Sequence, residues 1–347
     1  MIDTRRWNIV KNINKSNEMI QEAANYLIIG DTVAFPTETV YGLGADATNK
    51  DAVAKIFQAK GRPQDNPLIA HVATKEQLLN LVTNVPDYVD RLIETFSPGP
   101  ITYVLPSNGV CAENVTAGLS TIGVRIPSHP VALALIKACG LPIAAPSANI
   151  SGKPSPTTAD HVWEDLSGRI AGVVDGGPTG VGVESTVIDC TQDIPVILRP
   201  GGITLEELEV VVGKVLIDPA FEKGETKEKP KAPGMKYKHY APEVPMWLID
   251  GDFKHMQQVI NNLIADGKSV GVLANRNTLE RLSSEEKVYA HSLGESLEDV
   301  AANLYDGLRS FKYGEVDIIL CETYQEIGIG LAIMNRLKKA ASKLIHE

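Results

Sequence analysis

Apolar residues follow helical spacing and short runs in alternation along the first part of the chain. Positions 19, 20, 23, 24, 27 and 28 are apolar, which predicts a helix over residues 19–28 that ends at Gly30. The stretch "TVAFPTET" (32–39) predicts a strand with Pro36 near its end. A second helix is predicted to start at Asn49 or Asp51 and to stop at Gly61, which places Lys60 in its last turn.

Short apolar runs dominate the next 130 residues. We interpret them as strands: "PLIAHV", "ITYVLP", "TIGVRIP", "PIAAPS", "STVIDC" and "PVILRPG". Helical patterns lie between only some of them, for example over residues 131–139, which Gly140 closes. This incomplete alternation of strands and helices favours a mixed sheet. Thr204 and Glu207 fit a capping box, so a helix is expected to begin there.

The composition changes over residues 218–245, which are rich in lysine, acidic residues and proline. We interpret this segment as a linker or long loop. After it, the predicted strands "PMWLID", "SVGVLAN" and "VDIILCE" alternate with predicted helices over 253–265, 297–311 and 327–345. The sequence therefore predicts an α/β protein with a mixed-sheet domain over 1–217, a linker over 218–245 and a smaller doubly wound, Rossmann-like domain over 246–347.

The totals narrow the functional class. The 347 residues carry a formal net charge of −10, which argues against nucleic-acid binding over the whole surface but permits a local basic site. No apolar stretch is long enough to span a membrane, and the start "MIDTRRWNIV" lacks the order of a signal peptide. The four cysteines are far apart, which makes zinc and a disulfide framework unlikely. A cytoplasmic protein with reduced thiols is the expectation.

Several loops that follow predicted strands combine small residues, hydroxyls and cations. Such groups suit phosphate and carboxylate oxygens, and ligands commonly bind at strand ends. The loops are "PTETVYGLG", "KGRPQDN", "GVRIPSHP", "APSANISGKPSPT", "GVEST" and "RPGG". The standard P-loop, G-x-S-x-G, H-E-x-x-H and zinc patterns are missing, and "GLGADA" is treated as a chance match to a dinucleotide motif.

Each polar residue in these loops also has an ordinary structural interpretation. Arg125 lies in an apolar strand and needs either an internal carboxylate or a ligand anion, two alternatives of equal weight. For the others the structural alternatives are a favourable helix end for Lys60, turn formation for Ser147 and Asn149, a core position for His71, a surface ion pair for Arg199 and a surface acid for Glu184. The functional hypothesis rests on the residues as a group.

Taken in order, the motifs resemble the YrdC-like family. The pattern Lys-x-Arg followed by Ser-x-Asn is the hallmark of that family, here Lys60, Arg62, Ser147 and Asn149, and the resemblance covers about residues 15 to 210. The stretch "APGMKYKHYAP" and the α/β region after it are similar to the long, two-domain form of the family. The resemblance implies a twisted mixed sheet around a concave basic cavity.

The resemblance also implies a reaction. A nucleotidyltransferase of this family converts L-threonine, bicarbonate or carbon dioxide, and ATP into threonylcarbamoyl-adenylate and pyrophosphate, with Mg²⁺ accompanying ATP. A separate transferase complex then uses this product to modify the adenosine next to the anticodon of tRNA. Direct tRNA binding, oligomeric state and metal ligands are not indicated by the sequence.

By resemblance, each substrate has its own set of residues. Lys60 and Arg62 would carry the catalytic electrostatics. The ATP site would consist of Lys60, Arg62, Asn66, Thr121, Ser147, Asn149, Ser155, Arg199 and Tyr240, with His239 as an alternative to Tyr240. The threonine site would consist of Thr39, His71, Arg125, Ala145 and Ser185, with Arg125 pairing with the substrate carboxylate.

Two alternatives to this function stay open at the level of sequence. The first is an RNA-binding module that uses a basic cavity without chemistry, which the acidic net charge disfavours. The second is another carbamoyl-transfer enzyme, and the absence of acylphosphatase or zinc-finger segments from this sequence disfavours it. For the C-terminal domain, we hypothesise that it positions residues 218–245 as a lid.

Overall fold

A computed structural model describes residues 2–9, 16–219, 239–283 and 286–347 of the chain. The chain divides into two compact units, which are described separately. The first contains residues 1–151 and 155–237, and the second contains residues 152–154 and 238–347. Residues 220–238 lie outside the described residues, so the predicted linker over 218–245 and its role as a lid stay predictions.

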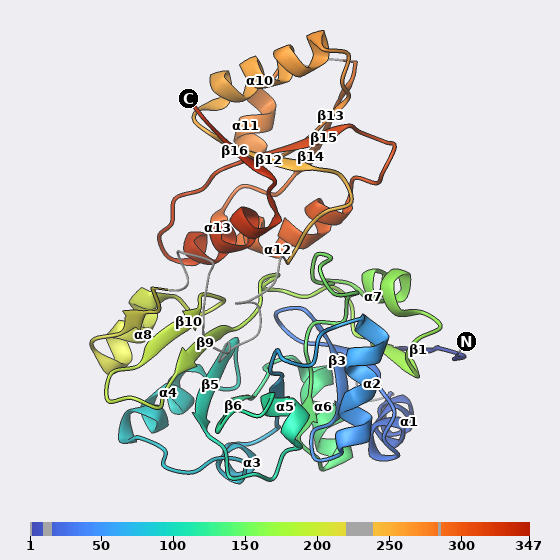
Figure 1. Ribbon diagram of the computed structural model, residues 1–347, viewed down its shortest axis with the longest axis vertical. Helices are drawn as coiled ribbons and strands as arrows, with labels where there is room; N and C mark the ends of the chain where they lie inside the picture. Colours follow the sequence, from blue (N-terminus) through green and yellow to red (C-terminus); the bar gives the residue numbers. More distant parts are fainter. Residues whose placement is uncertain (1, 10–15, 220–238, 284–285) are drawn as a thin grey trace. The chain divides into compact units, whose positions relative to one another are not determined.

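The first unit is built on one mixed sheet of eleven strands (Figure 1). Their spatial order is β1-β8-β2-β3-β7-β4-β6-β5-β9-β10-β11, with both parallel and antiparallel neighbours. This confirms the expected mixed sheet. The strands are β1 (Arg5–Asn8), β2 (Val33–Pro36), β3 (Tyr41–Asp46), β4 (Ile69–His71), β5 (Ile101–Pro106), β6 (Thr121–Arg125), β7 (Ile143–Ala144), β8 (Gly172–Asp175), β9 (Thr186–Asp189), β10 (Val196–Arg199) and β11 (Leu216–Ile217).

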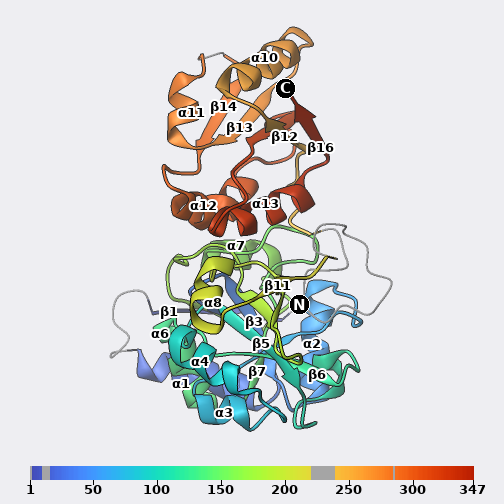
Figure 2. The same cartoon turned by 90° about the vertical axis from the view of Figure 1, so that its left-hand side faces the viewer.

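Alternating side chains give this sheet two apolar faces. Val33 and Phe35 of β2 belong to one buried cluster, whereas Ala34 between them belongs to the other. The helices that cover the sheet and complete the two clusters are α1 (Asn17–Ile28), α2 (Lys50–Lys60), α3 (Lys75–Leu79), α4 (Asp87–Phe96), α5 (Glu113–Thr116), α6 (Pro130–Cys139), α7 (Ala159–Leu166) and α8 (Leu205–Val212) (Figure 2). The sheet is therefore buried on both sides, and its polar side chains gather at the strand ends.

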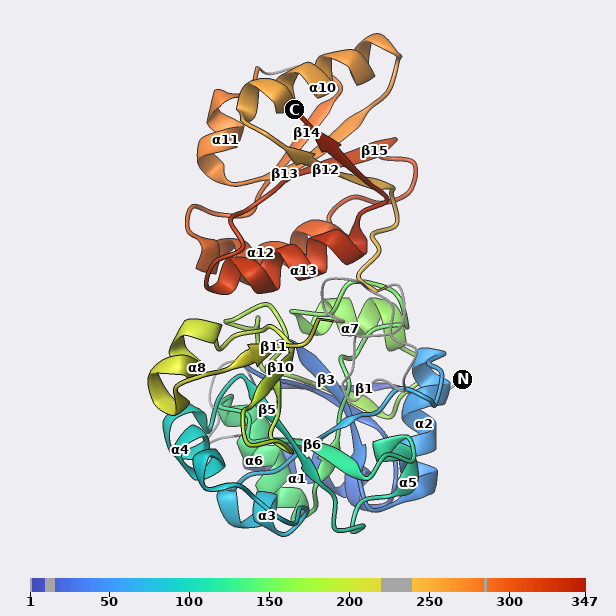
Figure 3. The ribbon, with the colours of Figure 1, turned by 60° about the vertical axis from the view of Figure 1, so that its left-hand side comes forward.

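The second unit contains a parallel sheet of five strands in the order β14-β13-β15-β12-β16. Figure 3 shows α10 and α11 on one face of this sheet and α12 and α13 on the other. The elements are β12 (Met246–Asp250), α10 (Phe253–Ala265), β13 (Val270–Ala274), α11 (Arg276–Arg281), β14 (Val288–Ser292), α12 (Leu297–Arg309), β15 (Ile318–Glu322), α13 (Ile329–Ala340) and β16 (Lys343–His346). The expected doubly wound α/β class is confirmed.

One predicted helix is wrong at its C-terminal end. The helix expected over 327–345 ends at Ala340, and residues 343–346 form β16, which pairs in parallel with β12. Leu344 and Ile345 continue the apolar pattern, but a helix and a short edge strand are hard to separate by periodicity over so few residues. Within the residues that the structure describes, no helix combines the length and the apolar character needed to cross a membrane.

Candidate functional site

Two parallel strands bring His71 and Arg125 side by side. In the register of β4 and β6, His71 is the direct partner of Arg125, and each residue ends its strand. Ala145 follows β7 and donates its backbone N–H to the carbonyl of Ile69 at 2.9 Å. His71 and Arg125 therefore end neighbouring parallel strands, whereas Ala145 lies beside Ile69, where β4 begins, because β4 and β7 are antiparallel.

The guanidinium of Arg125 is buried and has partners on all three nitrogens. Nη1 donates to Oγ1 of Thr39 at 3.0 Å, Nη2 to Oε1 of Glu38 at 2.5 Å, and Nε to the carbonyl of Gly99 at 3.3 Å. Burial raises the pKa of Glu38, but the charge and hydrogen bond of Arg125 outweigh it, so the pKa lies below its usual value. Of the two alternatives for Arg125, the internal carboxylate is present, and Arg125 would offer its remaining N–H groups to a ligand.

His71 is held as a neutral imidazole. Its Nδ1 lies 3.2 Å from the carbonyl of Ile69, which can only accept, so that nitrogen carries the proton. The ring also meets the ring of Phe35 edge-on at 6.2 Å. Burial, and then the positive charge of Arg125, lower the pKa of His71 to about 3. A neutral ring beside Arg125 avoids a second positive charge where a carboxylate is expected to bind.

The pKa of His71 predicts that the protein becomes less stable as the pH falls and that His71→Gln reduces this loss of stability. Because the folded pKa of about 3 lies below the unfolded value, the unfolded chain takes up a proton as the pH falls through about 6.5. The free energy of unfolding therefore decreases by about 2 kcal/mol between pH 7.5 and pH 5. Urea unfolding at the two pH values should show a smaller decrease for His71→Gln than for the wild type. Equal decreases would contradict the buried neutral ring.

A second group of polar residues centres on Ser185. Arg199 donates from Nη2 to the carbonyl of Ser185 at 2.9 Å and to its Oγ at 3.2 Å, and Oγ of Thr102 lies 2.8 Å from Oγ of Ser185. This arrangement requires a glycine at position 201, because a Cβ there would lie 2.3 Å from the backbone of residues 184–186. Arg199 is buried, so its interpretation as a surface ion pair is wrong.

Lys60 ties the end of α2 to the loop that carries Ser147 and Asn149. Gly61 ends the helix in the left-handed region, with φ of 62°, and the buried ammonium of Lys60 donates to the carbonyls of Ser147 and Asn149, both at 2.5 Å. Oγ of Ser147 donates in turn to Oδ1 of Asn149 at 2.6 Å, and the carbonyl of Lys60 accepts from the N–H of Ser151 at 2.9 Å. The Lys-x-Arg and Ser-x-Asn motifs are thus in direct contact.

The loop after Lys60 contains a buried amide that has no partner among the described residues. Both the nitrogen and the oxygen of the Asn66 side chain are buried without a hydrogen bond to any described residue. Nη2 of Arg62 donates to the carbonyl of Asn66 at 3.4 Å and to that of Pro67 at 3.3 Å. Because a buried carboxamide without partners is costly, Asn66 is the described side chain best placed to receive a ligand.

Ser155 and Glu184 form a further buried contact. Oγ of Ser155 donates to Oε1 of Glu184 at 2.6 Å, and both residues are buried. The interpretation of Glu184 as a surface acid is therefore wrong.

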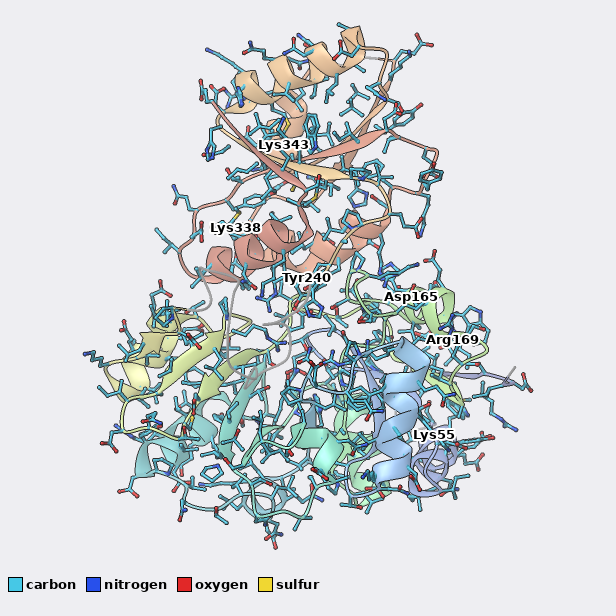
Figure 4. The ribbon with its side chains drawn as sticks, viewed as in Figure 1. Lys55, Asp165, Arg169, Tyr240, Lys338 and Lys343 are labelled. Atoms are coloured by element: carbon cyan, nitrogen blue, oxygen red, sulfur yellow. The ribbon has the colours of Figure 1, made fainter. Side chains whose placement is uncertain are left out.

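The remaining two residues of the predicted ATP site are Thr121 and Tyr240. Thr121 begins β6 and Arg125 ends it, so the two sit at opposite ends of one strand, about 13 Å apart at about 3.3 Å per residue. Tyr240, which is labelled in Figure 4, belongs to the second unit. The centroid of its ring lies 5.3 Å from that of Tyr305 of α12. The roles of both residues stay predictions.

Sequence reasoning missed the residues that hold the site together. Glu38 fixes Arg125, and it also accepts from the backbone N–H of Ser128 at 3.1 Å. Thr102 supports Ser185 from the neighbouring strand β5. Glu38 stands between two threonines in "PTETVYGLG", and an acid in a loop of small and hydroxyl residues was the available signal for it. Thr102 gave none, because it looks like any strand threonine.

Comparison with known proteins gives consistent results over both units. The model of a family described as "Telomere recombination", the Sua5–YciO–YrdC family, matches residues 25–201, and that of "Threonylcarbamoyl-AMP synthase, C-terminal domain" matches residues 203–342. A threonylcarbamoyl-AMP synthase of Bacillus subtilis is 51% identical over 97% of this chain and 98% of its own length. One of Pyrococcus abyssi is 49% identical over 93% and 94%.

A solved structure agrees in fold with the whole chain. It is the crystal structure of P. abyssi Sua5 complexed with L-threonine, which is 46% identical and has a TM-score of 0.93. The similarity covers 99% of this chain and 100% of the other.

Proposed function

The chain belongs to the threonylcarbamoyl-AMP synthase family, and from that premise we propose that it makes threonylcarbamoyl-adenylate from L-threonine, bicarbonate and ATP. The observation that carries the proposal is the buried pair of strand ends where His71 and Arg125 lie side by side. A neutral ring and a fixed guanidinium suit an amino acid carboxylate. The similar P. abyssi structure contains L-threonine, which supports the same ligand here.

The proposed chemistry has two steps. Bicarbonate takes up a proton and loses water to give carbon dioxide, and the threonine amine adds to the carbon dioxide, releases a proton and becomes a carbamate. A carbamate oxygen then attacks the α-phosphorus of ATP, and the bond to the β-phosphate oxygen breaks to release pyrophosphate. Charge accumulates on phosphate oxygens in the second step, so positioning and fixed donors lower its barrier without a protein nucleophile.

The residues that we assign to ATP supply such donors. Lys60 orders the loop of Ser147 and Asn149, and Asn66 offers an amide that has no partner among the described residues. Those residues also include no group of three or more histidine, cysteine, aspartate or glutamate side chains that could hold a metal. Magnesium would therefore enter as part of the MgATP substrate, held mainly by phosphate and water oxygens.

The chemistry of the product indicates which kind of reaction uses it. An acyl adenylate of this kind is an activated intermediate, and we propose that a separate transferase complex in the cytoplasm passes its threonylcarbamoyl group to the adenosine next to the anticodon of tRNA. The alternative of an RNA-binding module without chemistry is not favoured, because the described site residues suit small anionic ligands and the net charge is −10.

Pyrophosphate release by the purified protein without tRNA tests the proposal. Release should require ATP, Mg²⁺, threonine and bicarbonate together, and serine should be a poor substitute for threonine. Release that is absent, or that ignores threonine, would overturn the proposed function. In that case filter binding of RNA across a range of salt concentrations decides whether the module binds RNA instead.

A further inference from the structure

Three residues of the loop that carries the predicted ATP site belong to the second unit. Residues 152–154 group with residues 238–347, whereas Ser151 and Ser155 on either side group with the first unit. The loop therefore begins and ends with residues of the first unit, and its middle is held by contacts in the second.

The contacts within the second unit are specific. Nη2 of Arg309, at the end of α12, donates to the carbonyl of Pro154 at 2.6 Å, and the backbone N–H of Ala241 donates to the carbonyl of Gly152 at 3.0 Å. Nζ of Lys153 lies 3.5 Å from Oε1 of Glu243, but both side chains are exposed, so this pair contributes little.

Arg309 is the strongest of these anchors. Its side chain is only 7% exposed, and a hydrogen bond from a charged donor is worth more when it is shielded from water. It ends a well-formed helix: Ser296 and Asp299 make a capping box at the start of α12, and Tyr305 packs against Tyr240 at 5.3 Å. The carbonyl of Pro154 is thus held by a group that is itself fixed.

The residue after Pro154 is Ser155, whose Oγ donates to Glu184. We propose that Arg309 is a positioning residue for the nucleotide, acting through the Pro154 carbonyl to hold Ser155 and the preceding Ser147–Asn149 turn in a conformation that binds ATP. The inference rests on the proposed function. It gives the second unit a part in ATP binding that requires no contact between Arg309 and the ligand.

Arg309→Met tests this inference with the full-length protein. We expect the KM for ATP to rise about tenfold or more, as fits the loss of a hydrogen bond from a charged donor, while the KM for threonine changes less than twofold. Hydrogen exchange of peptides over residues 147–157 should be faster in the variant. Arg309→Lys, which keeps a charged donor, should recover part of the ATP affinity. The matched control is Arg276→Met, which removes an exposed guanidinium from the same unit and should behave as the wild type.

Other outcomes separate the possible failures. If Arg309→Met matches the control in exchange and in the KM for ATP, or if both KM values and exchange in both units change together, the positioning role is overturned. If Arg309→Met does not fold, Arg309→Gln decides, because it keeps a polar side chain but removes the charge: an unchanged KM for ATP overturns the role and a raised one supports it. A wild type that releases no pyrophosphate refutes the proposed function and the nucleotide role, whereas an active wild type with an unaffected variant refutes only this inference.

Discussion

Lys60→Met is expected to reduce threonine-dependent pyrophosphate release by about 100-fold or more. The substitution keeps the aliphatic stem of the side chain but removes the ammonium that donates to the carbonyls of Ser147 and Asn149. Each buried carbonyl that loses its donor costs about 1–3 kcal/mol, so the turn would relax away from the ATP-binding conformation. Steady-state release with ATP varied, together with thermal unfolding, measures the effect on activity and on the fold.

Lys55→Met is the matched control for this prediction. Lys55 lies on the same helix, is exposed, and pairs with Asp31 at 2.6 Å (Figure 4). Removing an exposed pair changes stability little, so the activity of this variant should stay near that of the wild type. Near-normal turnover of Lys60→Met would show that the ammonium is needed neither for the turn nor for phosphate. A sharp loss of activity in Lys55→Met would show that removal of any lysine from α2 has this effect.

Arg125→Met is expected to lower kcat/KM for threonine by a factor of about 100 to 1,000. Truncating one partner of a buried charge pair typically costs about 2–5 kcal/mol. Two losses contribute here, because the threonine carboxylate would lose its proposed cation and Glu38, whose side chain is only 12% exposed, would lose the cation that pairs with it. Kinetics with threonine varied at saturating ATP would show the effect mainly in the KM for threonine.

The double variant Arg125→Met, Glu38→Gln separates the two losses. With Glu38 neutral, the buried charge is gone and the stability of the fold should recover in urea unfolding. Threonine binding should not recover, because the cation for the carboxylate is still missing. If both stability and threonine use return, Arg125 serves only to neutralise Glu38, and its proposed role in binding the substrate is wrong.

The sequence was sufficient where one local pattern decides the structure. The end of α2 at Gly61 and the capping box at Thr204 were predicted and are present, because each depends on a few adjacent residues. The strand order of the sheet was not predictable, since partners such as β1 and β8 are far apart in the sequence. The same is true of the contact between Lys60 and the Ser147 loop, which joins residues 87 positions apart.

Errors in the site came from judging residues one at a time. Glu184 and Arg199 have charged side chains that are usually exposed, and each is buried here because a partner elsewhere in the chain satisfies it. The resemblance to a family proposed both sets of site residues, but it does not report which side chains support them. Glu38 and Thr102 became visible only when the strands were assembled.

The strand β6 fixes the spacing between Thr121, which is predicted to contact ATP, and Arg125, which is predicted to contact threonine. Thr121 pairs with β5 and Arg125 pairs with β4, so neighbouring strands hold both ends of β6. The distance between the two residues therefore depends on the number of residues between them. Movements of the loops therefore cannot change the distance between Thr121 and Arg125. A deletion of one residue inside it would shorten the spacing and also turn Arg125 to the opposite face of the sheet. Selection should thus tolerate changes in the identity of residues 122–124 far better than a change in their number.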